Sequence, residues 1–251
     1  MPHPLAAGAV PAMSELRFRA LGPFGEIRPG DDLPALLASA VPEGDGILVV
    51  AQKIVSKAEG RIVALDEITP SDAARTLALE IDKDPRQVEV ILRETKRVLR
   101  KVPGVLICET HHGLICANAG VDLSNAPGPE TAILLPRDPD ASARAIANKL
   151  GPGRGVIVTD TFGRPWREGL VDVAIGVAGF EPMRSYVGQT DRAGRPLRVT
   201  VMALADQLAA AAGILMEKDS GKPAVWIMGI TPSGDGSLAN LLRDPARDLF
   251  R

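Results

Sequence analysis

Short apolar runs that each lead into a cluster of polar residues are the feature that most limits how this chain can fold. The clearest run, residues 155–158, predicts a buried strand and is followed by the polar segment 159–169. We expect Asp160 and Thr161 to lie where this strand ends and irregular backbone begins. Functional side chains are often placed at such ends. A polar turn with a helix N-cap is the alternative interpretation of the same residues.

The spacing of apolar residues predicts the other elements. Helices are expected at residues 31–41, 70–81, 84–99, 138–150 and 205–217, and strands at residues 47–51, 105–108, 114–117, 197–203 and 224–228. The second and third helices should form a helical hairpin. Because helices and strands do not alternate regularly, the chain predicts an α+β fold with mixed or antiparallel sheets and packed helices. Residues 1–15, rich in Pro and Ala, are expected to be a disordered tail, and residues 16–251 to fold as one domain or two subdomains.

Composition excludes two classes of partner. The net charge is -2 and no block of basic residues is present, so nothing indicates a nucleic-acid surface. No apolar stretch approaches the roughly 20 residues that cross a bilayer, and the first residues lack the order of a signal peptide. We therefore expect a cytoplasmic protein that does not bind membranes.

The two cysteines, Cys108 and Cys116, fall opposite each other in the hairpin expected between residues 105 and 117. A cross-strand disulfide is geometrically possible there. Two reduced, half-buried thiols are the favoured interpretation for a cytosolic chain.

Four polar clusters follow predicted strands, at residues 53–60, 118–125, 159–169 and 189–195. Together they contain the carboxylates Asp122, Asp160 and Asp191 and the cations Lys53, Lys57, Arg164, Arg167 and Arg195. This combination suits a nucleoside triphosphate bound through divalent ions, because Mg²⁺ and Mn²⁺ take carboxylate and phosphate oxygens while Lys and Arg neutralise the remaining charge. No GxxxxGK[ST] or GxGxxG motif is present, and no Ser-His-Asp or Cys-His arrangement is indicated.

Four ordered segments resemble one known family, the coenzyme F(420)-0 gamma-glutamyl ligases. They are VAQKIVSKAEGRIV (50–63), NAGVDLSNA (118–126), VIVTDTFGRPWREGLVDVAIGVAGF (156–180) and GQTDRAGRPLRVT (188–200). The chain's last ten residues are similar as well, so the resemblance runs from about Leu16 to Arg251.

The resemblance implies a GTP-dependent ligase that adds L-glutamate to the phospholactyl carboxylate of coenzyme F(420)-0, and then γ-linked glutamates. The carboxylate would be activated as an acyl phosphate, with release of GDP and phosphate. It further implies two Mg²⁺ or Mn²⁺ ions, a K⁺ ion and an intertwined homodimer, in a form without the nitroreductase-like domain of some bacterial members. A related amide ligase for another carboxylate and a noncatalytic deazaflavin-binding protein stay open as alternatives.

The resemblance also assigns roles to residues. Catalytic roles fall on Asp160, Thr161 and Lys57, and the metal ligands are Asp122, Asp160, Thr161 and Glu217. The GTP contacts are Phe24, Gly25, Glu26, Ile27, Gln52, Lys53, Lys57, Asn125, Met216, Glu217 and Lys218.

Overall fold

The computed structural model describes residues 15–124, 128, 130–217 and 220–248. Its strands are β1 (Arg17–Leu21), β2 (Gly46–Ala51), β3 (Ile62–Ala64), β4 (Thr95–Val102), β5 (Val105–Thr110), β6 (Ile115–Ala117), β7 (Thr131–Ile133), β8 (Arg154–Arg164), β9 (Arg167–Ala178), β10 (Met183–Ser185), β11 (Val201–Ala203) and β12 (Ala224–Met228). Its helices are α1 (Leu33–Ala40), α2 (Gln52–Ala58), α3 (Asp72–Ile81), α4 (Pro85–Arg93), α5 (Pro139–Leu150) and α6 (Leu204–Gly213), with single turns η1 (Leu65–Glu67), η2 (Asn118–Gly120), η3 (Leu238–Asn240) and η4 (Pro245–Arg247). The expected α+β class, with mixed and antiparallel sheets, is confirmed.

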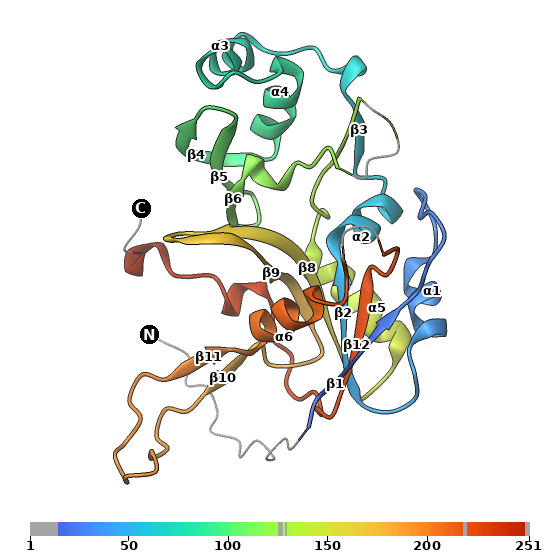
Figure 1. The fold of residues 1–251 in the computed structure, drawn as a ribbon, viewed down its shortest axis with the longest axis vertical. Helices are drawn as coiled ribbons and strands as arrows, with labels where there is room; N and C mark the ends of the chain where they lie inside the picture. The colour runs from blue at the N-terminus through green and yellow to red at the C-terminus, as the bar shows by residue number, and fades with distance from the viewer. Residues whose placement is uncertain (1–14, 125–127, 129, 218–219, 249–251) are drawn as a thin grey trace.

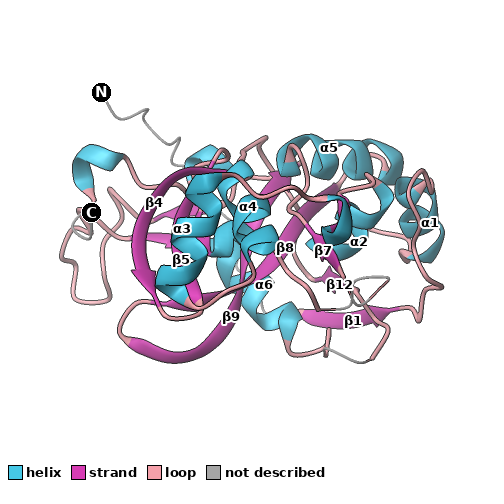
Figure 2. Cartoon of the chain, turned by 90° about the horizontal axis from the view of Figure 1, so that it is seen from above, coloured by secondary structure: helices cyan, strands magenta, loops and turns pink. Residues whose placement is uncertain are grey.

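A sheet in the order β1-β12-β2-β8-β9 forms the centre of the molecule (Figure 1). Its β2–β8 pair is parallel and its other pairs are antiparallel. Helices α1, α2 and α5 cover one face and α6 covers the other (Figure 2). Side chains of β2 alternate accordingly: Leu48 and Val50 pack on the first face, and Ile47 and Val49 on the second. Burial on both faces explains why β2 is a continuous apolar run.

A second group of elements lies above the sheet in Figure 1 and contains α3, α4 and the small sheet β4-β5-β6. Its core contains Ile81, Ile91 and Leu106, which are buried. Ser71 and Asp84 cap α3 and α4 by accepting hydrogen bonds from backbone N–H groups. The two helices pack against each other, so the predicted helical hairpin is confirmed.

The predicted helix at residues 84–99 is wrong in its second half. Helix α4 ends at Arg93, and β4 begins at Thr95. β4 pairs antiparallel with β5, with Thr95 opposite Thr110. Helical spacing of apolar residues is therefore overridden by tertiary pairing with a neighbouring strand.

The strand predicted at residues 155–158 continues past its expected end. β8 runs through Thr159 to Arg164, and antiparallel pairing with β9 keeps this polar stretch extended. Asp160 and Thr161 thus lie within a strand, where the sequence predicts irregular backbone. The polar segment is one half of a long hairpin whose turn is Pro165 and Trp166, and Trp166 is 85 % exposed.

Other boundaries differ less. The strand expected at residues 197–203 forms only as β11, and the helix expected at 205–217 ends at Gly213. The polar residues after β2 begin helix α2 directly. The strand at residues 224–228 and the helices predicted at 31–41, 70–81 and 138–150 are present within a few residues of their expected ends.

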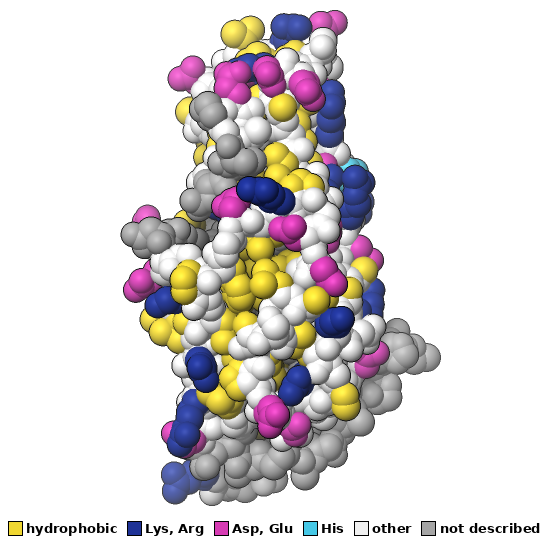
Figure 3. Space-filling model, turned by 90° about the vertical axis from the view of Figure 1, so that its right-hand side faces the viewer, with side chains coloured by type: hydrophobic (Ala, Val, Ile, Leu, Met, Phe, Trp, Pro, Cys, Tyr) yellow, Lys and Arg dark blue, Asp and Glu magenta, His cyan; other side chains and the backbone are white. Residues whose placement is uncertain are grey.

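No helix in the described part of the chain is long and apolar enough to span a membrane. One side of the molecule, the right-hand side of Figure 1, carries apolar side chains in its middle with charged ones around them (Figure 3).

Gly176 sets how closely α5 packs on β9. A Cβ at this position would overlap the backbone carbonyl of Pro139, at the first turn of α5. Gly176→Ala is therefore expected to lower the free energy of unfolding by about 2–3 kcal/mol, because backbone must move to admit the methyl group. Urea unfolding measures this loss. Gly163→Ala is the matched control, since its Cβ would meet its nearest neighbour, Leu170, at 3.9 Å. Equal stability of the two variants would contradict the packing argument.

Candidate active site

A cavity of about 1110 Å³ is lined by residues of β8, β9, α2 and α6 of the central part and of β6 and η2 of the second group of elements. It is lined by residues from five parts of the chain that are distant in sequence: 24–27, 51–57, 116–124, 159–163 with 170–172, and 210–217 with 221–223. Its volume is large for a pocket that holds one small ligand.

Three of the four polar clusters converge here. The fourth, residues 189–195, does not line the cavity; it lies in the long loop between β10 and β11. There Asp191 accepts hydrogen bonds from the backbone N–H groups of Ala193 and Arg195, so its carboxylate stabilises its own turn.

Most residues assigned from the resemblance line this one cavity. They are Phe24, Gly25, Glu26, Ile27, Gln52, Lys53, Lys57, Asp122, Asp160, Thr161, Met216 and Glu217. Asn125 and Lys218 lie outside the described residues.

Lys57 is the most deeply buried cation of the site. It is 8 % exposed, and its Nζ donates to Glu26 Oε1 at 2.5 Å. It projects from α2, whose apolar residues Ile54 and Val55 anchor the helix in the core. A buried ammonium held by a single exposed carboxylate can shift to a phosphate oxygen at little cost, because Glu26 is then resolvated.

Lys53, on the same helix, faces Asp122. Its Nζ lies 2.8 Å from Asp122 Oδ2 and 2.7 Å from Ser124 Oγ. Backbone hydrogen bonds with Ile133 fix Asp122 in place. Burial pushes the pKa of Asp122 upward, but the hydrogen bonds from Lys53 and Ser124 outweigh it and hold that pKa below its usual range. Asp122 is therefore ionised at neutral pH.

Asp160 lies in the same part of the cavity but in a different electrostatic state. Burial raises the pKa of Asp160 to about 6, and the negative charges of Asp122 and Asp172 add to the shift. Its described surroundings provide no Lys, Arg or His nitrogen within ion-pair distance. A carboxylate of this kind favours a cation supplied by a ligand.

Gln52 provides an unpaired donor. It is 1 % exposed and its Oε1 accepts from Ser56 Oγ at 2.8 Å, while its Nε2 has no hydrogen-bond partner among the described residues. An unsatisfied buried amide is costly, so one that lines a cavity indicates a ligand oxygen as its missing partner.

The side chains fit a hard divalent cation. Asp122, Asp160 and Thr161 offer oxygen atoms, as Mg²⁺ and Mn²⁺ require. In the described part of the chain, no three His, Cys, Asp or Glu side chains converge closely enough to form a complete metal site.

The sequence analysis did not single out Asp172, which also lines the cavity. It lies on β9 directly opposite Thr161, and Thr161 Oγ1 donates to Asp172 Oδ1 at 2.5 Å. A hairpin interpretation of residues 159–173, with Pro165 and Trp166 as the turn, would have placed these two residues together.

The cysteines occupy the predicted positions. Cys108 and Cys116 are directly opposite on β5 and β6, and both are buried free thiols. Burial raises the pKa of Cys116 to about 12, and the nearby charge of Asp160 adds to it. A thiol that stays protonated is a poor nucleophile, so Cys116 lines the cavity without being suited to covalent catalysis.

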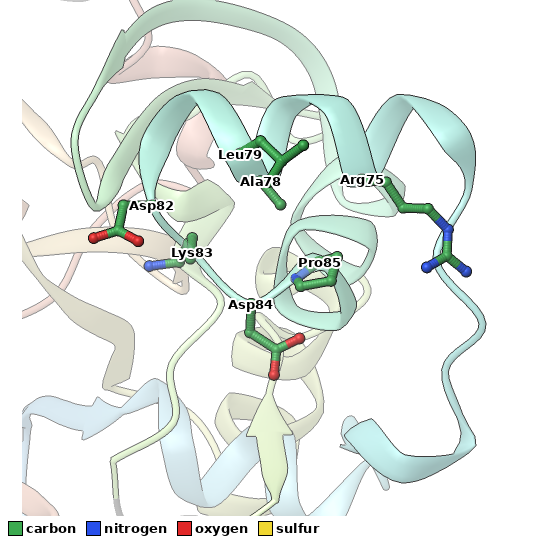
Figure 4. A pocket seen from close by; sticks show the side chains of 7 residues that line it. All are labelled: Arg75, Ala78, Leu79, Asp82, Lys83, Asp84 and Pro85. Atoms are coloured by element: carbon green, nitrogen blue, oxygen red, sulfur yellow. The ribbon is translucent and has the colours of Figure 1, made fainter.

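A second hollow, of about 470 Å³, lies on α3 and the start of α4 (Figure 4). Two of its charged groups are already engaged: Asp84 pairs with Arg86 at 2.7 Å, and Lys83 donates to the carbonyl of Gly104 at 2.9 Å. It contains none of the residues assigned from the resemblance.

Asp160→Asn is expected to stabilise the metal-free protein at neutral pH by on the order of 2 kcal/mol. The pKa of Asp160 is about 6 when folded, against an ordinary value of 3.8, so the folded state binds the proton more tightly. The free energy of unfolding that this proton contributes is fully present below the ordinary pKa of 3.8, and it is lost as the pH rises through the folded-state pKa of about 6. Asn mimics the neutral acid, so its advantage should appear at about pH 8 and vanish at about pH 3.5. Urea unfolding with EDTA at both pH values measures it; an advantage that grows at low pH would contradict the raised pKa.

Carboxylates, two lysines and a buried amide without a hydrogen-bond partner among the described residues line one cavity that is large enough for more than one substrate, as in an enzyme that joins two ligands. The sequence profile of the family described as "F420-0:Gamma-glutamyl ligase" matches residues 23–229. The chain belongs to this family and is a ligase that forms amide bonds.

Curated relatives cover almost the whole chain. It is 48 % identical over 238 residues to the "Coenzyme F420:L-glutamate ligase" of Methanopyrus kandleri, covering 90 % of this chain and 94 % of the relative. Proteins of the same name from Methanothermobacter thermautotrophicus and Archaeoglobus fulgidus are 47 % and 41 % identical, covering 88 % and 90 % of this chain and 93 % and 92 % of those relatives.

Proposed function

We propose that this enzyme uses GTP to join L-glutamate to the phospholactyl carboxylate of coenzyme F(420)-0, and then extends the product through γ-linked glutamates. The proposal rests on the names of the relatives and on one structural observation: the cavity gathers Lys53, Lys57, Asp122, Asp160 and Thr161 from three parts of the chain.

The reaction has two steps. In the first step, a carboxylate oxygen of the acceptor attacks the γ-phosphorus of GTP. The bond between the γ-phosphorus and the β,γ-bridging oxygen breaks, so an acyl phosphate forms and GDP leaves. The amine of glutamate, after losing a proton, then attacks the acyl carbon, and inorganic phosphate departs as the amide forms. A carboxylate needs this activation because it is otherwise a poor electrophile, and its mixed anhydride with phosphoric acid provides phosphate as the leaving group.

Side chains of this protein would neutralise the negative charge of the phosphate groups in the first step. Lys57 and Lys53 would bind phosphate oxygens, and the Nε2 of Gln52 would donate to a third oxygen of the nucleotide. Asp122, Asp160 and Thr161 would hold Mg²⁺ or Mn²⁺, and Glu217, which lines the same cavity, is proposed as a further ligand. Bound divalent ions supply positive charge that offsets the negative charge on the transferred phosphoryl group.

We also propose a homodimer. The β10–β11 arm extends away from the body (Figure 1) and exposes Val187, Val199 and Met202, and the β8–β9 hairpin exposes Leu170. A second chain would cover these apolar groups. Light scattering on the purified protein should give the mass of two chains, and a single-chain mass at all concentrations would contradict the dimer.

The function is tested by incubating the purified protein with coenzyme F(420)-0, L-glutamate, GTP and Mn²⁺, in KCl or NaCl. We expect a product heavier by one glutamyl unit, an equal amount of GDP, and a faster rate in KCl. Substituting ATP tests the nucleotide, and a panel of other carboxylates tests the acceptor. Binding of the coenzyme without release of GDP would contradict the ligase, and activity only with another carboxylate would contradict the acceptor.

A further inference from the structure

We propose that Asp172 is a positioning residue that orients the hydroxyl of Thr161 toward a divalent cation. This inference rests on the proposed function, because it deepens the role given there to Thr161. It concerns a residue that lines the cavity but has not yet been given a role.

The first observation is the direction of the hydrogen bond. Thr161 Oγ1 donates its proton to Asp172 Oδ1 at 2.5 Å. A hydroxyl has one proton and two acceptor lone pairs. A hydroxyl that coordinates a cation must point its proton elsewhere, and the bond to Asp172 does this before any ion arrives.

The second observation is how firmly Asp172 is held. Thr161 and Asp172 are directly opposite in the β8–β9 ladder, so their relative position is set by the backbone. On its other side, a Cβ at Gly213 would overlap Asp172 Oδ2, so the end of α6 lies against the carboxylate. The carboxylate is therefore confined between a strand and a helix.

The third observation is charge. In the described part of the chain, no Lys, Arg or His nitrogen lies within 4.0 Å of the Asp172 carboxylate, whereas Asp122 has Lys53 at 2.8 Å. The described residues therefore give the Asp172 carboxylate no ion-pair partner that would draw it away from the hydroxyl of Thr161. Partners that orient a metal ligand in this way typically contribute about 10–100-fold to metal affinity.

The test is Mn²⁺ binding by the full-length protein, followed from the free-ion signal in electron paramagnetic resonance, with Mn²⁺ alone and with a non-hydrolysable GTP analogue. Asp172→Ala and Thr161→Val should each weaken binding of one ion by at least about tenfold. The double variant should bind Mn²⁺ no more weakly than either single variant, because both changes remove the same oriented hydroxyl group. Asp172→Asn keeps an oxygen acceptor and should restore most of the affinity.

Gly213→Ala provides a variant that keeps the carboxylate but displaces it, and it should also weaken Mn²⁺ binding. It favours the helix, so its fold should survive. Asp66→Asn, an exposed residue of η1, is the control that should bind as the wild type does.

Unchanged Mn²⁺ binding by Asp172→Ala would overturn the inference, and so would losses of affinity that multiply in the double variant. Mn²⁺ binding by Asp172→Asn that is as weak as by Asp172→Ala would also overturn it, because Asp172 would then be a direct charged ligand. Failure of the proposed function looks different, since the wild-type protein itself would then neither bind Mn²⁺ nor extend the coenzyme.

Discussion

Asp160→Ala is expected to lower kcat at least about 1000-fold, which corresponds to about 4 kcal/mol of transition-state stabilisation. Among the described residues, no Lys, Arg or His nitrogen lies within ion-pair distance of Asp160, and the neighbouring Asp122 is already neutralised by Lys53. Removing Asp160 would leave Asp122, which is paired with a lysine, and Glu217 as the proposed carboxylate ligands of the divalent cation. The loss should fall on kcat, because charge on the transferred phosphoryl group is greatest in the transition state.

Steady-state release of GDP at saturating Mn²⁺ measures this effect. The fold should persist, because Asp160 is a strand residue whose charged form is already disfavoured by burial. Asp191→Ala is the control, since Asp191 lies in the β10–β11 loop and does not line the cavity. Wild-type turnover in Asp160→Ala would rule out its role as a ligand of an essential cation.

Lys57→Met is expected to lower kcat/KM for GTP about 100-fold, because it removes a charge-assisted hydrogen bond worth up to about 3 kcal/mol from a buried lysine. Methionine fills much of the same volume and leaves Glu26 as an exposed carboxylate that water can solvate. The fold should therefore tolerate the change.

Two variants accompany Lys57→Met. Lys149→Met makes the same change on the exposed surface of α5 and should leave kcat/KM unaltered. Glu26→Gln removes the lysine's partner and keeps the lysine; if Lys57 binds phosphate, its effect should be much smaller. Similar losses in Lys57→Met and Glu26→Gln would show that the ion pair itself, and not the free ammonium, is what the enzyme uses.

Local patterns in the sequence predicted those elements whose causes are local. Asp32, Ser71 and Asp138 cap α1, α3 and α5 where the sequence places helix starts, and the apolar run at residues 224–228 is strand β12 of the central sheet. A side-chain cap and a continuous apolar run depend on residues a few positions apart, so they can be recognised without the fold.

The errors have tertiary causes. Residues 95–99 have helical spacing but pair with β5, and residues 159–164 are polar but pair with β9. The second pairing also explains why Asp172 was missed: it reaches Thr161 only across the hairpin, through a register that the spacing of apolar residues does not reveal.

The sequence by itself determined the α+β class, the family, and which carboxylate, amide and lysine side chains are available for the site. Motifs and apolar periodicity depend only on the order of the residues, so they can be recognised without the fold. Only the tertiary structure decided which polar clusters meet. It placed Asp122 beside Lys53 and Thr161 opposite Asp172, and left Asp191 in a distant loop. The physical reason is that a site forms where strands and helices converge, and that convergence follows from strand pairing and core packing between distant segments.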